Sequence, residues 1–347
     1  MMSGNPPAVA ARLAALRHPV ALCLSGGGAR GAAQAGVVIE LVAHGLRPDL
    51  IVGTSIGAWN GSWLAAHPEI ESAAVLQAWW GDPEVRRMMR GMLLGYAGAI
   101  AWRRSAALSA GRVEHLLGRA LGRVTFQELP IPLAIGACDL LSGDLIYFDR
   151  GPVAAAVRAS SAIPTVLPPV PLDDRLFLDG GVIDNFGVNE AVRRGARTII
   201  LVDASTSELS RLPVGLGAII DRATLVAQVH QRRRSLAAAA GAGVPLHLIE
   251  VGVLGGVLDF AHLGGSLDLG RRTARAWLAG ETLPAPVPLA EEERRRVVAS
   301  WRVIEDRVLP LWRRATRQPA PRDGRGPAGS APAVALPPPG MSEASGG

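Results

Sequence analysis

Hydrophobic residues in this chain gather into short, uninterrupted runs that are separated by longer stretches of helix-compatible composition. Such runs are typical of buried strands in a parallel sheet. They predict strands at residues 19–25, 47–52, 131–138, 145–149, 175–178, 198–202 and 245–251. The intervening composition predicts helices at residues 32–44, 58–66, 153–159, 190–194, 212–240 and 269–279. Because strand and helix alternate from the start of the chain, we expect an α/β fold with a parallel sheet.

Changes in composition predict the domain organisation. We expect a variable leader at residues 1–18, one large domain at 19–280 and an arginine-rich helical extension at 281–317. Residues 318–347 are rich in proline, glycine, alanine and serine, which predicts a disordered tail. Within the large domain, residues 68–125 form a helical region that is rich in tryptophan, methionine and arginine, most densely at 88–102. It is interpreted either as ordinary packing against the sheet or as a mobile apolar cover that touches lipid.

The charge of the chain is positive, and all 36 of its basic residues are arginine, with a formal net charge of +6. The arginines are scattered and are not interleaved with aromatic residues, so we expect no nucleic-acid partner. Cys23 and Cys138 lie in apolar runs and are predicted to be reduced core residues, with no metal site and no cofactor. We see no secretory signal and no apolar run of the ~18–20 residues that a spanning helix needs. We therefore expect a cytoplasmic protein; the cover interpretation would add peripheral contact with an anionic membrane surface.

One candidate nucleophile follows directly from a strand–turn–helix pattern. Gly53-Thr54-Ser55-Ile56-Gly57 lies between a predicted strand and a predicted helix, which is the context of a nucleophile elbow. Gly53 and Gly57 would permit a turn too tight for a Cβ atom. Ser55 would then project from the sheet at a helix N-terminus. The alternative is a glycine-rich turn in which the serine only caps the helix.

A serine hydroxyl needs a base, and the better candidate is an aspartate. The histidines, including His247 and His262, do not occupy glycine-framed turns that would present them to a cleft. Asp179 ends a predicted strand, where active-site groups gather in open α/β sheets, and it precedes Gly180 and Gly181. A dry pocket would raise the pKa of Asp179 and make it a better base near neutral pH. The alternative is an aspartate that only forms an Asx-turn.

A second glycine-rich turn precedes the elbow. Gly26-Gly27-Gly28-Ala29-Arg30-Gly31 opens a predicted helix, so several backbone N–H groups can point at one oxyanion. The same residues match a dinucleotide-binding pattern. That alternative needs an acidic group at the end of the second strand, whereas Asp49 precedes that strand and the strand leads into Ser55.

Together these motifs resemble the patatin-like phospholipases. The resemblance is carried by residues 26–31, 53–57, 159–164 and 179–181, in that order, and covers roughly residues 19–205, with a weaker extension to about 280. It implies a three-layer α/β/α patatin-like fold with a central, mainly parallel sheet. It also implies a Ser–Asp dyad without histidine, in which Ser55 is the nucleophile and Asp179 the base. The turn at 26–31, mainly Gly27 and Gly28, would be the oxyanion hole.

The resemblance therefore predicts a serine lipid acyl hydrolase that cleaves carboxylic ester bonds of phospholipids or lysophospholipids through an acyl-enzyme, without a metal. Besides a dinucleotide-binding oxidoreductase, two other functions stay open. One is an esterase of the α/β-hydrolase type, with a triad completed by His247 or His262. The other is a non-catalytic lipid-binding protein on the same fold.

Overall fold

The computed structural model describes residues 12–69, 72–83, 85, 110–164, 166–205, 216–251, 262–281 and 295. The chain divides into two compact units, Met1–Leu289 and Ala290–Gly347, and all elements named below belong to the first. The expected cover segment at 88–102 and the expected tail at 318–347 lie outside the described residues, as does nearly all of the extension at 281–317.

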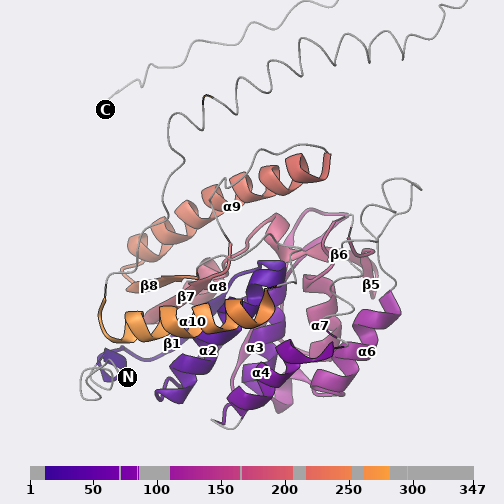
Figure 1. Cartoon of the computed structure of the whole chain (residues 1–347). Helices are drawn as coiled ribbons and strands as arrows, with labels where there is room; N and C mark the ends of the chain where they lie inside the picture. Colours follow the sequence, from indigo (N-terminus) through magenta and orange to yellow (C-terminus); the bar gives the residue numbers. More distant parts are fainter. Residues whose placement is uncertain are drawn as a thin grey trace, which may run out of the picture. The chain divides into compact units, whose positions relative to one another are not determined.

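An eight-stranded sheet forms the centre of the first unit, in the order β5-β6-β3-β2-β1-β7-β8, with β4 also paired to β3 (Figure 1). Strands β1, β2, β3, β7 and β8 run parallel to one another. Strands β4 and β6 are antiparallel to β3, and β5 is antiparallel to β6. The strands are β1 Val20–Leu24, β2 Leu50–Thr54, β3 Leu133–Asp139, β4 Leu145–Phe148, β5 Val170–Leu172, β6 Arg175–Asp179, β7 Thr198–Asp203 and β8 Leu246–Glu250. The predicted mainly parallel sheet is confirmed.

Helices cover both faces of this sheet, which makes three layers (Figure 1). Alternate residues of β1 show why: Val20, Leu22 and Leu24 belong to one hydrophobic core, and Ala21 and Cys23 to another. The first core is completed mainly by α2, α3, α6, α7 and α10, and the second by α8 and α9. The helices are α2 Gly31–Ala43, α3 Ile56–Ala66, α4 Ser72–Gly81, α6 Ala110–Leu121, α7 Val153–Ser160, α8 Val188–Arg193, α9 Leu216–Gly241 and α10 Leu263–Leu278, with short 3-10 helices η1 Gly28–Arg30, η2 Phe126–Glu128 and η3 Gly180–Val182. This is the expected α/β/α fold.

Some predicted boundaries were wrong, because tertiary contacts override local composition. The strand predicted at 47–52 is β2, Leu50–Thr54, which runs two residues further towards the elbow. The helix predicted from Leu269 begins at Leu263 and continues through Gly264 and Gly265. There the packing of α10 on α2 outweighs the low helix propensity of glycine. Strand β5 was not predicted at all; it is only three residues long.

No helix of the described ranges is long and apolar enough to cross a bilayer. Cys23 and Cys138 are both free and buried, which agrees with the prediction that they are core residues.

Candidate active site

Ser55 lies in the turn between β2 and α3 with φ 56° and ψ −122°. A positive φ is uncommon for a residue with a side chain and marks local strain, which recurs at functional sites. The turn is as tight as its sequence predicts. A Cβ atom on Gly57 would lie 2.0 Å from the carbonyl oxygen of Leu24, and one on Gly53 would lie 2.7 Å from the carbonyl oxygen of Gly57.

Strand β3 brings Ser55 and Asp179 together from distant parts of the chain. Gly136 of β3 pairs with both β2 and β4, so these two strands lie on opposite edges of β3. Ala137 pairs with both β4 and β6, so β6 lies on the same edge as β2 and follows it end to end. Thr54 is opposite Gly136 and Asp179 is opposite Ala137. Ser55, which follows Thr54, and Asp179 therefore come together beside the neighbouring residues Gly136 and Ala137 of β3.

The carboxylate of Asp179 is buried, and the side chain of Ser55 lies close enough to it to lower its pKa. Its Oδ1 also accepts the backbone N–H of Gly181 at 2.8 Å. Burial raises the pKa of Asp179 to about 6, and the hydrogen bonds from Ser55 and Gly181 oppose that rise. Gly180 allows the turn after Asp179 to pass close to β3, because a Cβ atom on Gly180 would lie 2.3 Å from the carbonyl oxygen of Gly136. The site thus contains a hydroxyl beside a carboxylate whose pKa is raised by burial.

Ser160, at the end of α7, connects the elbow to β3 through two hydrogen bonds. Its Oγ accepts the backbone N–H of Ser55 at 2.8 Å and donates to the carbonyl oxygen of Gly136 at 2.6 Å. The neighbouring Ser161 accepts the indole N–H of Trp59 at 2.9 Å. Neither serine has a role that the sequence predicts, although residues 159–164 are one of the motifs that carry the resemblance. Two adjacent serines carry no signal that says which backbone group they will bind.

The glycine-rich turn at 26–31 runs directly beside Ser55, since a Cβ atom on Gly26 would lie 3.0 Å from the Cβ of Ser55. The N–H of Gly26 donates to Asn185 Oδ1 at 3.0 Å, and the N–H of Arg30 donates to the carbonyl oxygen of Gly27 at 3.2 Å. The N–H of Gly31 is also used, within the helical turn.

Among the described residues, the N–H groups of Gly27, Gly28 and Ala29 have no acceptor. Gly28 has φ 58°, a conformation that glycine adopts without strain. Of the six residues predicted to form an oxyanion hole, this geometry favours Gly27, Gly28 and Ala29 as donors. Gly26, Arg30 and Gly31 shape the turn.

The two histidines of the alternative triad occupy different places. His247 lies within β8, which is separated from β2 by β1 and β7, and its ring packs on Trp277 with centroids 5.7 Å apart. Burial, and then the charge of Arg12, lower the pKa of His247. His262 directly precedes α10, which contacts the 3-10 helix at Gly28–Arg30. His262 is therefore the histidine to test against Asp179, whose pKa the Ser55 side chain lowers.

The acidic group required for dinucleotide binding is misplaced. Asp49 lies at the amino end of β2, where its Oδ2 accepts the backbone N–H of Val20 at 2.6 Å. The carboxyl end of β2, where a ribose would bind, leads into Ser55.

The fold and site together define a class: a three-layer α/β protein with a strained serine, a buried carboxylate beside it and, among the described residues, N–H groups without an acceptor at a helix N-terminus. These are the parts of a serine hydrolase. Residues 22–192 match the model of the family described as Patatin-like phospholipase. This match to a patatin-like phospholipase domain confirms the resemblance.

Several proteins are similar to this chain. An uncharacterized NTE family protein of Mycobacterium tuberculosis is 35% identical over 189 residues, which are 54% of this chain and 50% of that protein. Lysophospholipase NTE1 of Candida albicans is 28% identical over 57% of this chain and 14% of its own length. The solved structure of VipD from Legionella pneumophila covers 76% of this chain and 67% of its own, at 15% identity and a TM-score of 0.44.

The chain spans about half the length, or less, of the curated relatives it matches. At the level of the family, the match supports lipid hydrolysis.

Proposed function

We propose that this protein is a serine lipid acyl hydrolase that works through a dyad of Ser55 and Asp179. The observation that carries the proposal is the placement of the strained Ser55 beside the buried Asp179, whose pKa burial raises to about 6. A carboxylate with this pKa is ionised at neutral pH, yet it is a far better proton acceptor than a solvated aspartate.

The reaction proceeds in two halves. Asp179 takes the proton of Ser55 as the Ser55 oxygen attacks the acyl carbon of the ester, and the tetrahedral oxyanion receives hydrogen bonds from the N–H groups of Gly27, Gly28 and Ala29. The C–O bond of the ester then breaks, the alcohol leaves with the proton from Asp179, and an acyl-Ser55 intermediate remains. In the second half, Asp179 takes a proton from water, whose oxygen attacks the acyl group. The bond between the acyl carbon and the Ser55 oxygen then breaks, Asp179 returns the proton to that oxygen, and the fatty acid leaves.

Two local features favour this chemistry. The donors lie at the N-terminal end of η1 and α2, where unused N–H groups favour negative charge. The strain at Ser55 holds its side chain clear of the sheet, beside both the base and the donors. Because these groups are fixed before the ester binds, little reorganisation accompanies the attack.

We infer phospholipids or lysophospholipids as the substrate class. The family description and the printed name of the Candida albicans relative both support it. Peripheral contact with an anionic membrane surface fits such a substrate and the net charge of +6.

The test compares wild type, Ser55→Ala and Asp179→Asn on a soluble p-nitrophenyl ester and on lysophosphatidylcholine. Each variant is expected to lose several orders of magnitude in kcat, because the two residues act as a unit. Ser55→Ala is also expected to lose covalent labelling by a fluorophosphonate.

His247→Ala and His262→Ala are the matched controls and are expected to retain turnover. Loss of turnover in His262→Ala alongside an active Asp179→Asn would replace the dyad by a triad. A folded wild type with neither turnover nor labelling would instead indicate a non-catalytic lipid-binding protein.

A further inference from the structure

Gln231 on α9 lies outside the residues that match the family, 22–192, yet its side chain contacts the site from the far side of the turns. We propose that Gln231 is a positioning residue that fixes the base turn and the oxyanion turn relative to each other. The inference rests on the proposed function and adds to it a residue that acts through its neighbours and not on the substrate.

The amide of Gln231 is buried and uses both of its ends. Its Nε2 donates to the carbonyl oxygens of Gly181 and Val182, each at 3.2 Å. Its Oε1 accepts the backbone N–H of Asn185 at 3.0 Å. Gly181 is also the residue whose N–H binds Asp179. Gln231 therefore holds the opposite side of the peptide segment that binds the base.

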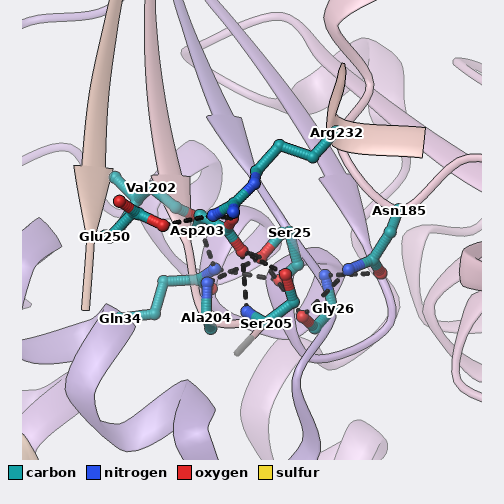
Figure 2. Close-up of polar contacts among 10 residues, drawn as sticks. All are labelled: Ser25, Gly26, Gln34, Asn185, Val202, Asp203, Ala204, Ser205, Arg232 and Glu250. Atoms are coloured by element: carbon teal, nitrogen blue, oxygen red, sulfur yellow. Dashed lines mark hydrogen bonds and ion pairs between the residues drawn. The ribbon is translucent and has the colours of Figure 1, made fainter. Parts of the chain in front are cut away.

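Asn185 carries this connection to the oxyanion turn. Its Oδ1 accepts the N–H of Gly26 at 3.0 Å, and its Nδ2 donates to the carbonyl oxygen of Gly26 at 3.3 Å, as Figure 2 shows. Both backbone groups of Gly26 are thus fixed by one side chain, which is itself almost fully buried. A continuous path of hydrogen bonds runs from Asp179 through Gly181, Gln231 and Asn185 to Gly26.

The next residue of α9 holds the residue before Gly26. Arg232 Nη1 donates to Asp203 Oδ2 at 3.2 Å and also pairs with Glu250 (Figure 2). The other oxygen of Asp203 accepts from the Ser25 hydroxyl at 3.4 Å, and Ser25 Oγ accepts the N–H of Ala204 at 2.8 Å. Since Gln231 and Arg232 are consecutive, one turn of α9 is connected through Asn185 to Gly26 and through Asp203 to Ser25.

The consequence for the reaction follows from distance. The donors at Gly27 to Ala29 must be placed where the oxyanion forms, and a shift of about 1 Å in a catalytic geometry costs on the order of 100-fold in rate. A soluble ester makes few contacts with these turns before attack. Loosening them is therefore expected to lower kcat and to leave KM almost unchanged.

The experiment uses the full chain and Gln231→Leu, which keeps the approximate shape of the side chain and removes its hydrogen bonds. We expect kcat for the p-nitrophenyl ester, and the rate of fluorophosphonate labelling, to fall 10- to 100-fold, with KM within about threefold of wild type. Rates are divided by the concentration of active sites from titration, so that unfolded protein does not count.

Gln228→Leu is the matched control, because this half-buried glutamine lies three residues earlier on α9 and its side chain makes no hydrogen bond to another described residue. It is expected to match wild type. Gln231→Glu is a second variant, which keeps the acceptor for Asn185 and loses the donor to Gly181 and Val182. Its kcat is expected to lie between those of Gln231→Leu and wild type.

Asn185→Ala tests the path itself. The double variant Gln231→Leu/Asn185→Ala is compared with the two single variants. If Gln231 acts through Asn185, the double variant should lose little more kcat than either single variant, so that the fold-losses are not multiplicative.

Unchanged kcat in Gln231→Leu, a loss accounted for by fewer active sites, or fully multiplicative losses would each overturn the inference. If Gln231→Leu does not fold, Gln231→Glu is judged by the same kcat and KM criteria. An inactive wild type would refute the proposed function, whereas an active wild type equalled by Gln231→Leu would refute this inference alone.

Discussion

Asp179→Asn should make the protein more stable at neutral pH while removing its activity. The substitution preserves the shape of the side chain. An asparagine Oδ1 can still accept the N–H of Gly181, as the carboxylate does at 2.8 Å, and its Nδ2 can donate to Ser55. What the variant lacks is the negative charge, which the folded protein buries.

The magnitude follows from the pKa of Asp179, which burial raises from an ordinary value of 3.8 to about 6. The folded state thus binds the proton more tightly than the unfolded state. The resulting stability is fully present below pH 3.8 and is lost as pH rises through about 6. At ~1.4 kcal/mol for each pH unit, the loss amounts to about 3 kcal/mol at pH 8. Asp179→Asn never ionises, so it should exceed wild type by about that amount at pH 8 and match it near pH 4.

The assay is urea unfolding followed by circular dichroism at pH 4, 5, 6, 7 and 8 for both proteins. Other buried acids, above all Asp203, also make stability depend on pH, because burial raises the pKa of Asp203 as well. The difference between the two proteins cancels these contributions. In parallel, kcat/KM of wild type should rise with pH through about 6 and then level off, as Asp179 becomes the ionised base.

The reasoning would be refuted by a free-energy difference that stays constant from pH 4 to 8, or by a variant less stable than wild type at pH 8. Either result would mean that the buried charge is compensated in the folded state. A kcat/KM that falls only near pH 4 would likewise mean that the pKa of Asp179 is not raised.

Further predictions concern the elbow and the Asp203 cluster. Gly57→Ala should abolish turnover and destabilise the fold, since its Cβ would lie 2.0 Å from the carbonyl oxygen of Leu24. Gly118→Ala, whose Cβ meets nothing within 4 Å, should be neutral or stabilising by up to ~1 kcal/mol; a comparable loss of thermal stability in both would contradict the steric argument. Arg232→Met should cost about 3 kcal/mol at pH 8, because the buried Asp203 keeps a charge without its arginine. The deficit should shrink as the pH is lowered, because burial raises the pKa of Asp203 and the folded state favours its protonated form; a deficit in urea unfolding that does not change with pH would count against it.

Much of the fold could be predicted because it depends on local or alternating patterns. The uninterrupted apolar runs indicated strands with both faces buried, and both faces of β1 do contribute to hydrophobic cores. Errors arose where packing opposed composition, as at the start of α10, where Gly264 and Gly265 are helical. The assignment of catalytic roles to Ser55 and Asp179 stays a prediction until the variants are measured.

The serines and amides that support the site could not be predicted in the same way. Ser160, Asn185 and Gln231 are ordinary polar residues in sequence, and each acquires its role from a backbone group that lies far along the chain. Gln231 in particular sits in a helix with no motif around it. Only the packing of α9 brings its amide to Gly181 and Asn185.

The sequence by itself determined the shape of the turns, because steric limits act between near neighbours: the elbow at 53–57 and the turn at 26–31 require glycine wherever they occur. The tertiary structure decided which groups meet. Ser55 and Asp179 are 124 positions apart and come together because β2 and β6 share one edge of β3. Strand register of this kind is set by the packing of the whole sheet, and no local pattern encodes it.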